Sequence, residues 1–182
     1  MASAAQHHNT LEAGVNPIVI VMGITASGKT TVARKLAERL GWRFLEGDDM
    51  HSPENIAKMH AGIALTTADR MPWLHAIGEW VDARIAADEP ATVSCSALMR
   101  HYRDLLARER PAVRFVFLTG DPAIIARRLA ARKNHFMSPT LLQSQLKTLE
   151  PPGADERALT VPLDLTPDEQ CDKVIAWLDG YM

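Results

Sequence analysis

The sequence predicts an α/β protein with a parallel sheet between two layers of helices. Two observations favour this class. Short apolar runs alternate with helical stretches along the chain, and the first run, 17–22, is apolar throughout, as in a strand covered on both faces. A length of 182 residues, 47% of them hydrophobic and 23% charged, suffices for a substantial core and excludes a disordered or collagen-like chain.

The expected strands are apolar or β-branched runs that end at glycine, proline or polar residues. In chain order they are 17–22, 42–45, 91–95, 113–118 and 159–163. Strands that alternate with helices require crossover connections, which are nearly always right-handed. The polar residues 1–16 precede the first strand, and 17–182 are expected to form a single domain.

Capping residues mark most of the expected helices. Gly41 ends the first helix, and Ser52 and Asp121 cap two later ones. Thr166 and Glu169 form a capping box before the last helix. The expected helices are 30–40, 53–62, 69–88, 98–108, 122–132, 139–149 and one that begins at 167. We expect the 98–108 helix to expose a face rich in arginine.

Charge and cysteine content exclude several function classes. The net charge of -2 gives no sign of nucleic acid or an anionic membrane as a partner. The apolar run at 18–22 is far shorter than the ~20 residues that cross a bilayer, and 1–16 lacks the apolar segment of a signal peptide. Cys95 and Cys171 are expected to be free thiols, which favours a reducing, cytoplasmic location.

Residues 23–30, Gly-Ile-Thr-Ala-Ser-Gly-Lys-Thr, match the P-loop pattern G-x-x-x-x-G-K-[ST]. The match lies directly between an apolar strand and an amphipathic helix, where backbone N–H groups and the helix dipole can face a phosphate. Gly23 and Gly28 permit close approach of the backbone. Lys29 can reach the β- and γ-phosphates, and Thr30 offers its hydroxyl to Mg²⁺. The sequence therefore predicts a nucleoside triphosphate site.

The other motifs narrow the choice among P-loop proteins. A guanine-recognition pattern N-K-x-D is absent, and Asp121, which follows an apolar strand, is better explained as a helix cap. Small kinases remain, in which an acceptor hydroxyl attacks the γ-phosphate. Such enzymes need a carboxylate beside the acceptor, cations over the phosphoryl group and a cover that excludes water.

Two segments can meet these needs. Residues 46–51, Glu-Gly-Asp-Asp-Met-His, follow the second strand at the carboxyl edge of the sheet, where such folds bind ligands. Asp48 is expected to orient the acceptor hydroxyl and take its proton. A basic cluster favours a phosphate-covering lid over simple compensation of a helix dipole; it comprises Arg127, Arg128, Arg132, Lys133 and His135.

From about residue 17 onward the chain resembles gluconokinases of the small P-loop type. Besides the P-loop, the resemblance is carried by 47–51, 55–59, 69–74, 95–98, 101–106 and 132–136. It implies transfer of the γ-phosphoryl group of ATP, with Mg²⁺, to the 6-hydroxyl of D-gluconate, feeding the pentose phosphate route. It also implies a five-stranded sheet in the order 2-3-1-4-5, like that of shikimate kinases. A substrate-binding helical segment at about 49–90, a lid at about 132–140 and a homodimer are further implications.

The residues and the resemblance together give the expected site. The catalytic candidates are Lys29, Asp48 and Arg132. The nucleotide candidates are Gly23, Ala26, Ser27, Gly28, Lys29, Thr30, Thr31, Arg128 and Pro152. The candidates for the gluconate carboxylate and hydroxyls are Asp48, His51, Lys58, Arg70, Ser96 and His135. Mg²⁺ is assigned to Thr30 and Asp48, with Glu46, where the family commonly has Asp, as a further candidate. The tryptophans, Trp42, Trp73, Trp80 and Trp177, are expected to be packing residues.

Two alternatives stay open on the sequence. One is another small-molecule kinase, such as a shikimate or adenylyl-sulfate kinase, although the third strand leads into Cys95-Ser96-Ala97 in place of the glycine-rich turn typical of shikimate kinases. The other is a nucleotide-binding regulatory protein without catalysis. The joint presence of Lys29, Thr30 and Asp48 argues against the second.

Overall fold

The computed structural model describes residues 15–131 and 139–180, apart from the side chains of 139–141. Five strands form one sheet in the order β2-β3-β1-β4-β5, and every neighbouring pair is parallel. The strands are β1 (Ile18–Met22), β2 (Arg43–Glu46), β3 (Ala91–Ser94), β4 (Val113–Thr119) and β5 (Ala158–Pro162). This architecture confirms the predicted fold class and strand order.

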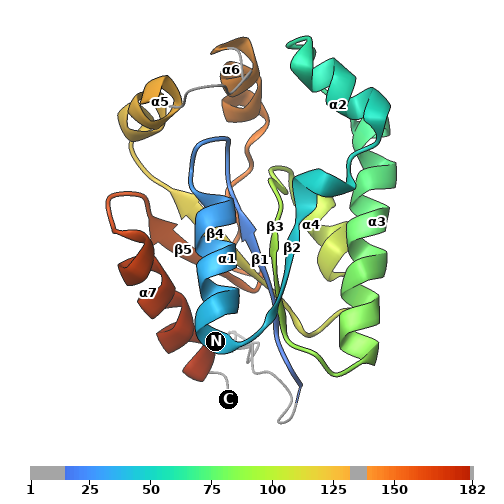
Figure 1. The fold of residues 1–182 in the computed structure, drawn as a ribbon, viewed down its shortest axis with the longest axis vertical. Helices are drawn as coiled ribbons and strands as arrows, with labels where there is room; N and C mark the ends of the chain where they lie inside the picture. Colours follow the sequence, from blue (N-terminus) through green and yellow to red (C-terminus); the bar gives the residue numbers. More distant parts are fainter. Residues whose placement is uncertain (1–14, 132–138, 181–182) are drawn as a thin grey trace, which may run out of the picture.

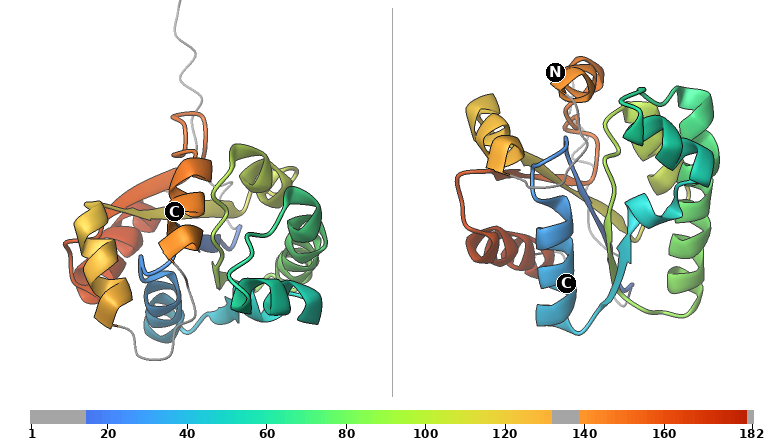
Figure 2. Two further views of the ribbon diagram at one scale, coloured as in Figure 1. Left: turned by 90° about the horizontal axis from the view of Figure 1, so that it is seen from above. Right: turned by 45° about the horizontal axis from the view of Figure 1, so that its top comes forward.

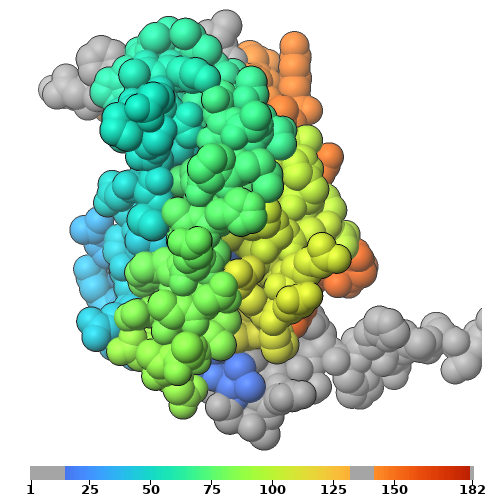
Figure 3. All heavy atoms as spheres, turned by 90° about the vertical axis from the view of Figure 1, so that its right-hand side faces the viewer, coloured from blue at the N-terminus to red at the C-terminus, as the bar shows by residue number. Residues whose placement is uncertain are grey.

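Helices cover both faces of the sheet (Figure 1). They are α1 (Lys29–Leu40), α2 (Pro53–His60), α3 (Thr67–Ala86), α4 (Arg100–Ala107), α5 (Pro122–Ala131), α6 (Pro139–Thr148) and α7 (Pro167–Asp179), with a 3₁₀ helix, η1 (Gly47–Met50). α1 and α7 lie on one face, and α3 and α4 on the other. Figure 3 shows the outer surface of the second face, where green α3 runs beside yellow-green α4.

The remaining helices gather where the strands end. α2, α5 and α6 lie beyond the carboxyl ends of the strands, and the view from above places α6 between α5 and α2 (Figure 2). In a parallel sheet this edge collects the loops that follow each strand, so it is where a ligand site is expected.

Side chains of β1 alternate between the two halves of the core. Ile18, Ile20 and Met22 pack with α3 and α4. Val19 and Val21 pack with α1 and α7. All of these side chains are fully buried, and each contributes about 1.5–3 kcal/mol of transfer free energy. The continuous apolar run is thus explained by a central strand covered on both sides.

The caps explain where the helices begin and end. The Ser52 side chain accepts from the backbone N–H of Asn55 at 3.2 Å, and Thr166 forms the predicted capping box with Glu169. Gly41 ends α1 with φ of 70°. The start of α3 was wrongly predicted at residue 69: Asp69 is the third residue of a helix capped by Thr66, and the two side chains form a capping box.

Both cysteines are free, as predicted, and both are buried. Burial raises the pKa of the Cys95 thiol to about 12, and it raises the pKa of Cys171 as well. Both thiols are therefore protonated near neutral pH, and neither has the thiolate that a nucleophile needs.

Candidate active site

The P-loop forms a tight cradle between β1 and α1. Gly23 has φ of 141°, and a Cβ there would lie 2.7 Å from the carbonyl oxygen of Leu118. Gly28 has φ of 99° and caps α1, and Ala26 also has a positive φ, of 60°. The two glycines thus stand where side chains would be strained, which is the physical reason for their place in the motif.

Lys29 reaches back over the loop. Its Nζ donates to the carbonyl oxygen of Ile24 at 3.0 Å. Arg128 supports the loop from outside, donating to the carbonyl oxygens of Ser27 at 3.1 Å and Leu163 at 2.8 Å. Arg128 therefore touches the backbone of the P-loop from α5.

One cleft of about 330 Å³ joins the P-loop to the opposite side of the site. The P-loop and α1 contribute Thr25, Ala26, Gly28, Lys29, Thr30 and Thr31. The facing wall contributes Glu46, Asp48, His51, Met59, Ala64, Leu65, Arg70, Trp73 and Ser96. α6 adds Ser144 and Gln145. The P-loop and a set of polar side chains on the opposite wall thus share one space.

The carboxylates of Glu46 and Asp48 belong to the end of β2 and to η1, where close packing restricts the backbone. A Cβ on Gly47 would lie 2.2 Å from the carbonyl oxygen of Ser94, so only glycine lets η1 pass this close to β3. The Trp73 indole N–H donates to the carbonyl oxygen of Gly47 at 2.6 Å. The Ser94 hydroxyl donates to the Glu46 carboxylate. These contacts orient Glu46 and the following Asp48 toward the cleft.

His51 and Arg70 add polar groups to the facing wall. The His51 ring stacks on Trp73 with ring centroids 4.2 Å apart. Burial lowers the pKa of His51; the nearby carboxylate of Asp48 raises it by a smaller amount, and Arg70 lowers it further. A neutral imidazole can donate from one nitrogen and accept at the other, and its buried Nδ1 has no hydrogen-bond partner among the described residues. Arg70 donates to the carbonyl oxygen of Leu65, at the cleft margin.

Several predicted residues do not line this cleft. Lys58 pairs with Asp69 at 2.7 Å, and this contact, with the Thr66 cap, lowers the pKa of Asp69 to about 2. Pro152 lies in the loop between α6 and β5, and Gly23 and Ser27 form the P-loop without facing the cleft. Arg132 and His135, together with most of the expected lid, lie outside the described residues.

Other cleft residues were missed from the sequence. Trp73 is buried, as predicted for a packing residue, but it also lines the cleft and holds the turn at Gly47. Its spacing on α3 matches that of the buried apolar residues of the helix, so the sequence pattern indicated packing alone. Ser144 and Gln145 carried no motif, and only the position of α6 brings them to the P-loop.

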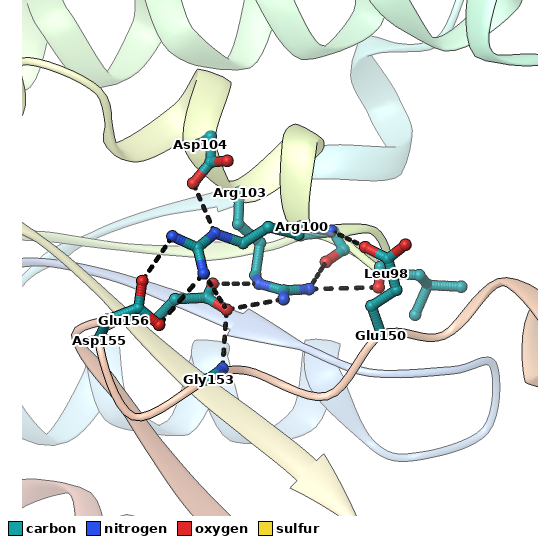
Figure 4. A network of polar contacts seen from close by, with 9 residues as sticks. Leu98, Arg100, Arg103, Asp104, Glu150, Gly153, Asp155 and Glu156 are labelled. Carbon is teal, nitrogen blue, oxygen red and sulfur yellow. Dashed lines mark hydrogen bonds and ion pairs between the residues drawn. The ribbon is translucent and has the colours of Figure 1, made fainter.

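Arg103 corrects the prediction of an exposed arginine face on α4. It is 1% exposed and donates to Glu156 at 2.5 and 2.9 Å. It also donates to the carbonyl oxygens of Ala97 and Leu98, both at 3.2 Å. Figure 4 shows this guanidinium between the loop after β3 and the loop after α6. The arginine ties the segment that carries Ser96 to the segment that carries Pro152.

Glu156, the carboxylate that pairs with Arg103, is charged at neutral pH. Burial raises the pKa of Glu156, but hydrogen bonds from Arg103 and from the Gly153 N–H outweigh it, so the pKa lies below its usual range. A carboxylate with a lowered pKa stabilises the fold above its unfolded pKa, and this contribution is lost as the pH falls through the folded value.

We expect Arg103→Leu to lower the free energy of unfolding by about 3–5 kcal/mol, because Glu156 is left charged and buried without its partner. Arg100→Leu is the matched control: Arg100 is 43% exposed, bonds to Asp104 and Asp155 at the surface, and reaches Glu156 only at 3.6 Å, against 2.5 Å for Arg103. The control should lose at most about 1 kcal/mol. Urea unfolding measures the free energy of unfolding of both variants, and equal losses would contradict a stabilising buried ion pair between Arg103 and Glu156.

A larger depression of about 820 Å³ lies elsewhere, between α3, α4 and residues 155–157. It contains none of the predicted site residues, and its walls include surface ion pairs such as Arg100 with Asp155. The predicted site residues that line a cavity among the described residues therefore lie in the smaller cleft at the P-loop.

Comparison with known proteins identifies the family of the chain. The model of the AAA domain family matches residues 18–152. A gluconokinase of Gluconobacter oxydans is 43% identical over 169 residues, which cover 92% of this chain and 94% of that protein. The chain belongs to the gluconokinase family. A solved gluconokinase from Sinorhizobium meliloti superposes with a TM-score of 0.81 at 45% identity, over 91% of this chain and 93% of that one.

The family assignment decides between the kinases left open by the sequence. The APS kinase CysC of Mycobacterium tuberculosis has a TM-score of 0.68 but only 18% identity, over 90% of this chain and 98% of that one. That likeness shows a shared fold alone. Among the described residues, no helix is both long and apolar enough to span a bilayer.

Proposed function

We propose that this chain transfers the γ-phosphoryl group of ATP to the 6-hydroxyl of D-gluconate. The observation that carries the proposal is the single cleft in which Lys29 faces a wall containing Asp48, His51 and Arg70. Phosphoryl transfer is governed by positioning and charge stabilisation, and this cleft offers both for a small hydroxylated anion. The family of the chain supports gluconate as that anion.

The acceptor wall suits a sugar acid. Arg70 supplies a planar cation for the carboxylate, and it is the one arginine on this wall among the described residues. His51 and the Ser96 hydroxyl can each donate or accept, which suits a chain of hydroxyl groups. Asp48 is proposed to orient the attacking hydroxyl and to take its proton as the new bond forms.

Mg²⁺ fits the oxygen ligands of the site. Thr30, Asp48 and Glu46 all line the cleft. Mg²⁺ commonly binds one or two protein oxygens and takes its other ligands from phosphates and water, so these three side chains could supply its protein ligands. When bound, it would neutralise charge on the β- and γ-phosphates.

The remaining parts of the proposal extend the family resemblance. Residues 49–90 would form the acceptor-binding segment, and the chain would act in the cytoplasm as a homodimer that feeds the pentose phosphate route. Lys58 would reach gluconate only by leaving Asp69. Arg132, His135 and the lid at 132–140 lie outside the described residues.

An acceptor panel tests the proposal. The purified protein with Mg²⁺ and ATP should release ADP rapidly with gluconate. It should release ADP only at background rate with shikimate, adenylyl sulfate, a nucleoside monophosphate or no acceptor. Transfer to another member of the panel would replace gluconate as the substrate, and no transfer at all would favour a nucleotide-binding protein without catalysis.

Arg70→Ala tests the acceptor wall. We expect KM for gluconate to rise about tenfold or more, because one charge-assisted contact is lost, while KM for ATP changes little. Arg84→Ala is the control on the same helix, since Arg84 bonds to Glu89 and does not line the cleft. Equal KM values for gluconate in the two variants would remove Arg70 from the carboxylate site.

A further inference from the structure

A side chain on α6 holds the P-loop from across the cleft. The Oε1 of Gln145 lies 2.6 Å from the backbone nitrogen of Thr25, 120 positions earlier in the chain. Thr25 is only 5% exposed, and both residues line the cleft. A backbone N–H is a donor only, so the carbonyl end of the Gln145 amide must face the loop.

The same peptide group also holds the catalytic lysine. The N–H of Thr25 and the C=O of Ile24 belong to one planar unit and point in opposite directions. Gln145 accepts from the N–H at one end, and the Lys29 Nζ donates to the carbonyl oxygen at the other end at 3.0 Å. Rotation of this peptide plane would turn the carbonyl away from Lys29, and the Gln145 contact opposes that rotation.

We propose that Gln145 is a positioning residue for phosphoryl transfer. It fixes the Ile24–Thr25 peptide plane, and through that plane it fixes the place of the Lys29 ammonium group at the cleft. A hydrogen bond that polarises one end of a peptide group also strengthens the bond at the other end. The inference rests on the proposed function, because it assigns Gln145 a part in that reaction.

Gln143 provides a matched control. It is the same residue type on the same helix, but it is exposed and does not line the cleft. Gln145→Leu and Gln143→Leu therefore remove the same group at similar cost to the helix, and only the first removes the contact with Thr25. Gln145→Glu keeps an oxygen that can accept from Thr25 and adds a negative charge beside the phosphate cradle.

Steady-state kinetics give the first test. Gln145→Leu should lower kcat by about 10- to 100-fold, the range expected for one lost contact to a buried donor, with KM for gluconate little changed. Gln143→Leu should match the unchanged protein. A kcat equal to that of Gln143→Leu would overturn the proposal. So would a lower KM for ATP with unchanged kcat, because the contact would then merely occupy the place of a phosphate oxygen.

Hydrogen exchange gives a second test that needs no acceptor. The amide of Thr25 should exchange faster in Gln145→Leu than in Gln143→Leu, and Gln145→Glu should restore its protection while raising KM for ATP. Equal exchange in the two leucine variants would overturn the proposal. Failure of the unchanged protein to phosphorylate gluconate would refute the proposed substrate alone, since exchange at Thr25 would still report whether Gln145 holds the P-loop.

Discussion

Lys29→Ala is expected to reduce kcat/KM by about 10²- to 10³-fold or more, the cost of removing one charged donor from a transferring group. Lys29 lies at the start of α1, lines the cleft and bonds to the carbonyl oxygen of Ile24. We expect this position to direct its ammonium group at a phosphate held by the P-loop backbone. No other lysine lines the cleft among the described residues.

Lys35→Ala is the control for this loss. Lys35 lies on the same helix, but its ammonium group pairs with Asp168 at the surface, where the side chains are 34% and 65% exposed. An exposed pair of this kind contributes at most about 1 kcal/mol, so the control should keep nearly full activity. Circular dichroism and thermal unfolding would establish that both variants fold. Equal activity of the two variants would refute a phosphate site at Lys29.

Asp48→Asn should lower kcat by about 10²-fold or more while KM for ATP changes far less. Asparagine keeps the shape of the side chain, but it cannot take the proton of the attacking hydroxyl. Because the transition state of phosphoryl transfer is loose, the loss arises as much from misplacement of the hydroxyl as from weaker basicity.

Asp49→Asn separates this role from a general effect of charge. Asp49 is the next residue of η1 and is also exposed, but it does not line the cleft. It should therefore keep the turnover of the unchanged protein. Similar losses in both variants would indicate that η1 acts through its net charge, and unchanged turnover in Asp48→Asn would exclude it as the base.

The local parts of the site could be predicted from the sequence. The P-loop depends on neighbouring residues, because Gly23 and Gly28 adopt backbone angles that other residues avoid. The caps at Ser52 and Thr166 are local for the same reason. Asp48, His51 and Ser96 line the cleft because the segments that directly follow parallel strands share one edge, and Arg70 reaches it from α3.

Contacts between residues far apart in the sequence could not be predicted. Arg103 belongs to a helix whose pattern resembles an exposed arginine face, yet its partner Glu156 lies 53 positions later and draws it into the interior. Lys58 was expected at the acceptor, but the nearer carboxylate of Asp69 binds it. A long charged side chain takes the partner that packing brings closest, and that partner is not encoded next to it.

The sequence by itself determined the succession of strands and helices along the chain and the P-loop, because backbone conformation and hydrophobic period depend on residues close together in the chain. The family and the order of strands in the sheet followed from motifs along the chain that resemble those of gluconokinases. Only the tertiary structure decided that Gln145 meets Thr25 and that Trp73 supports the turn at Gly47. These contacts exist because the packing of the helices against the sheet brings distant segments within hydrogen-bonding distance, which no local pattern records.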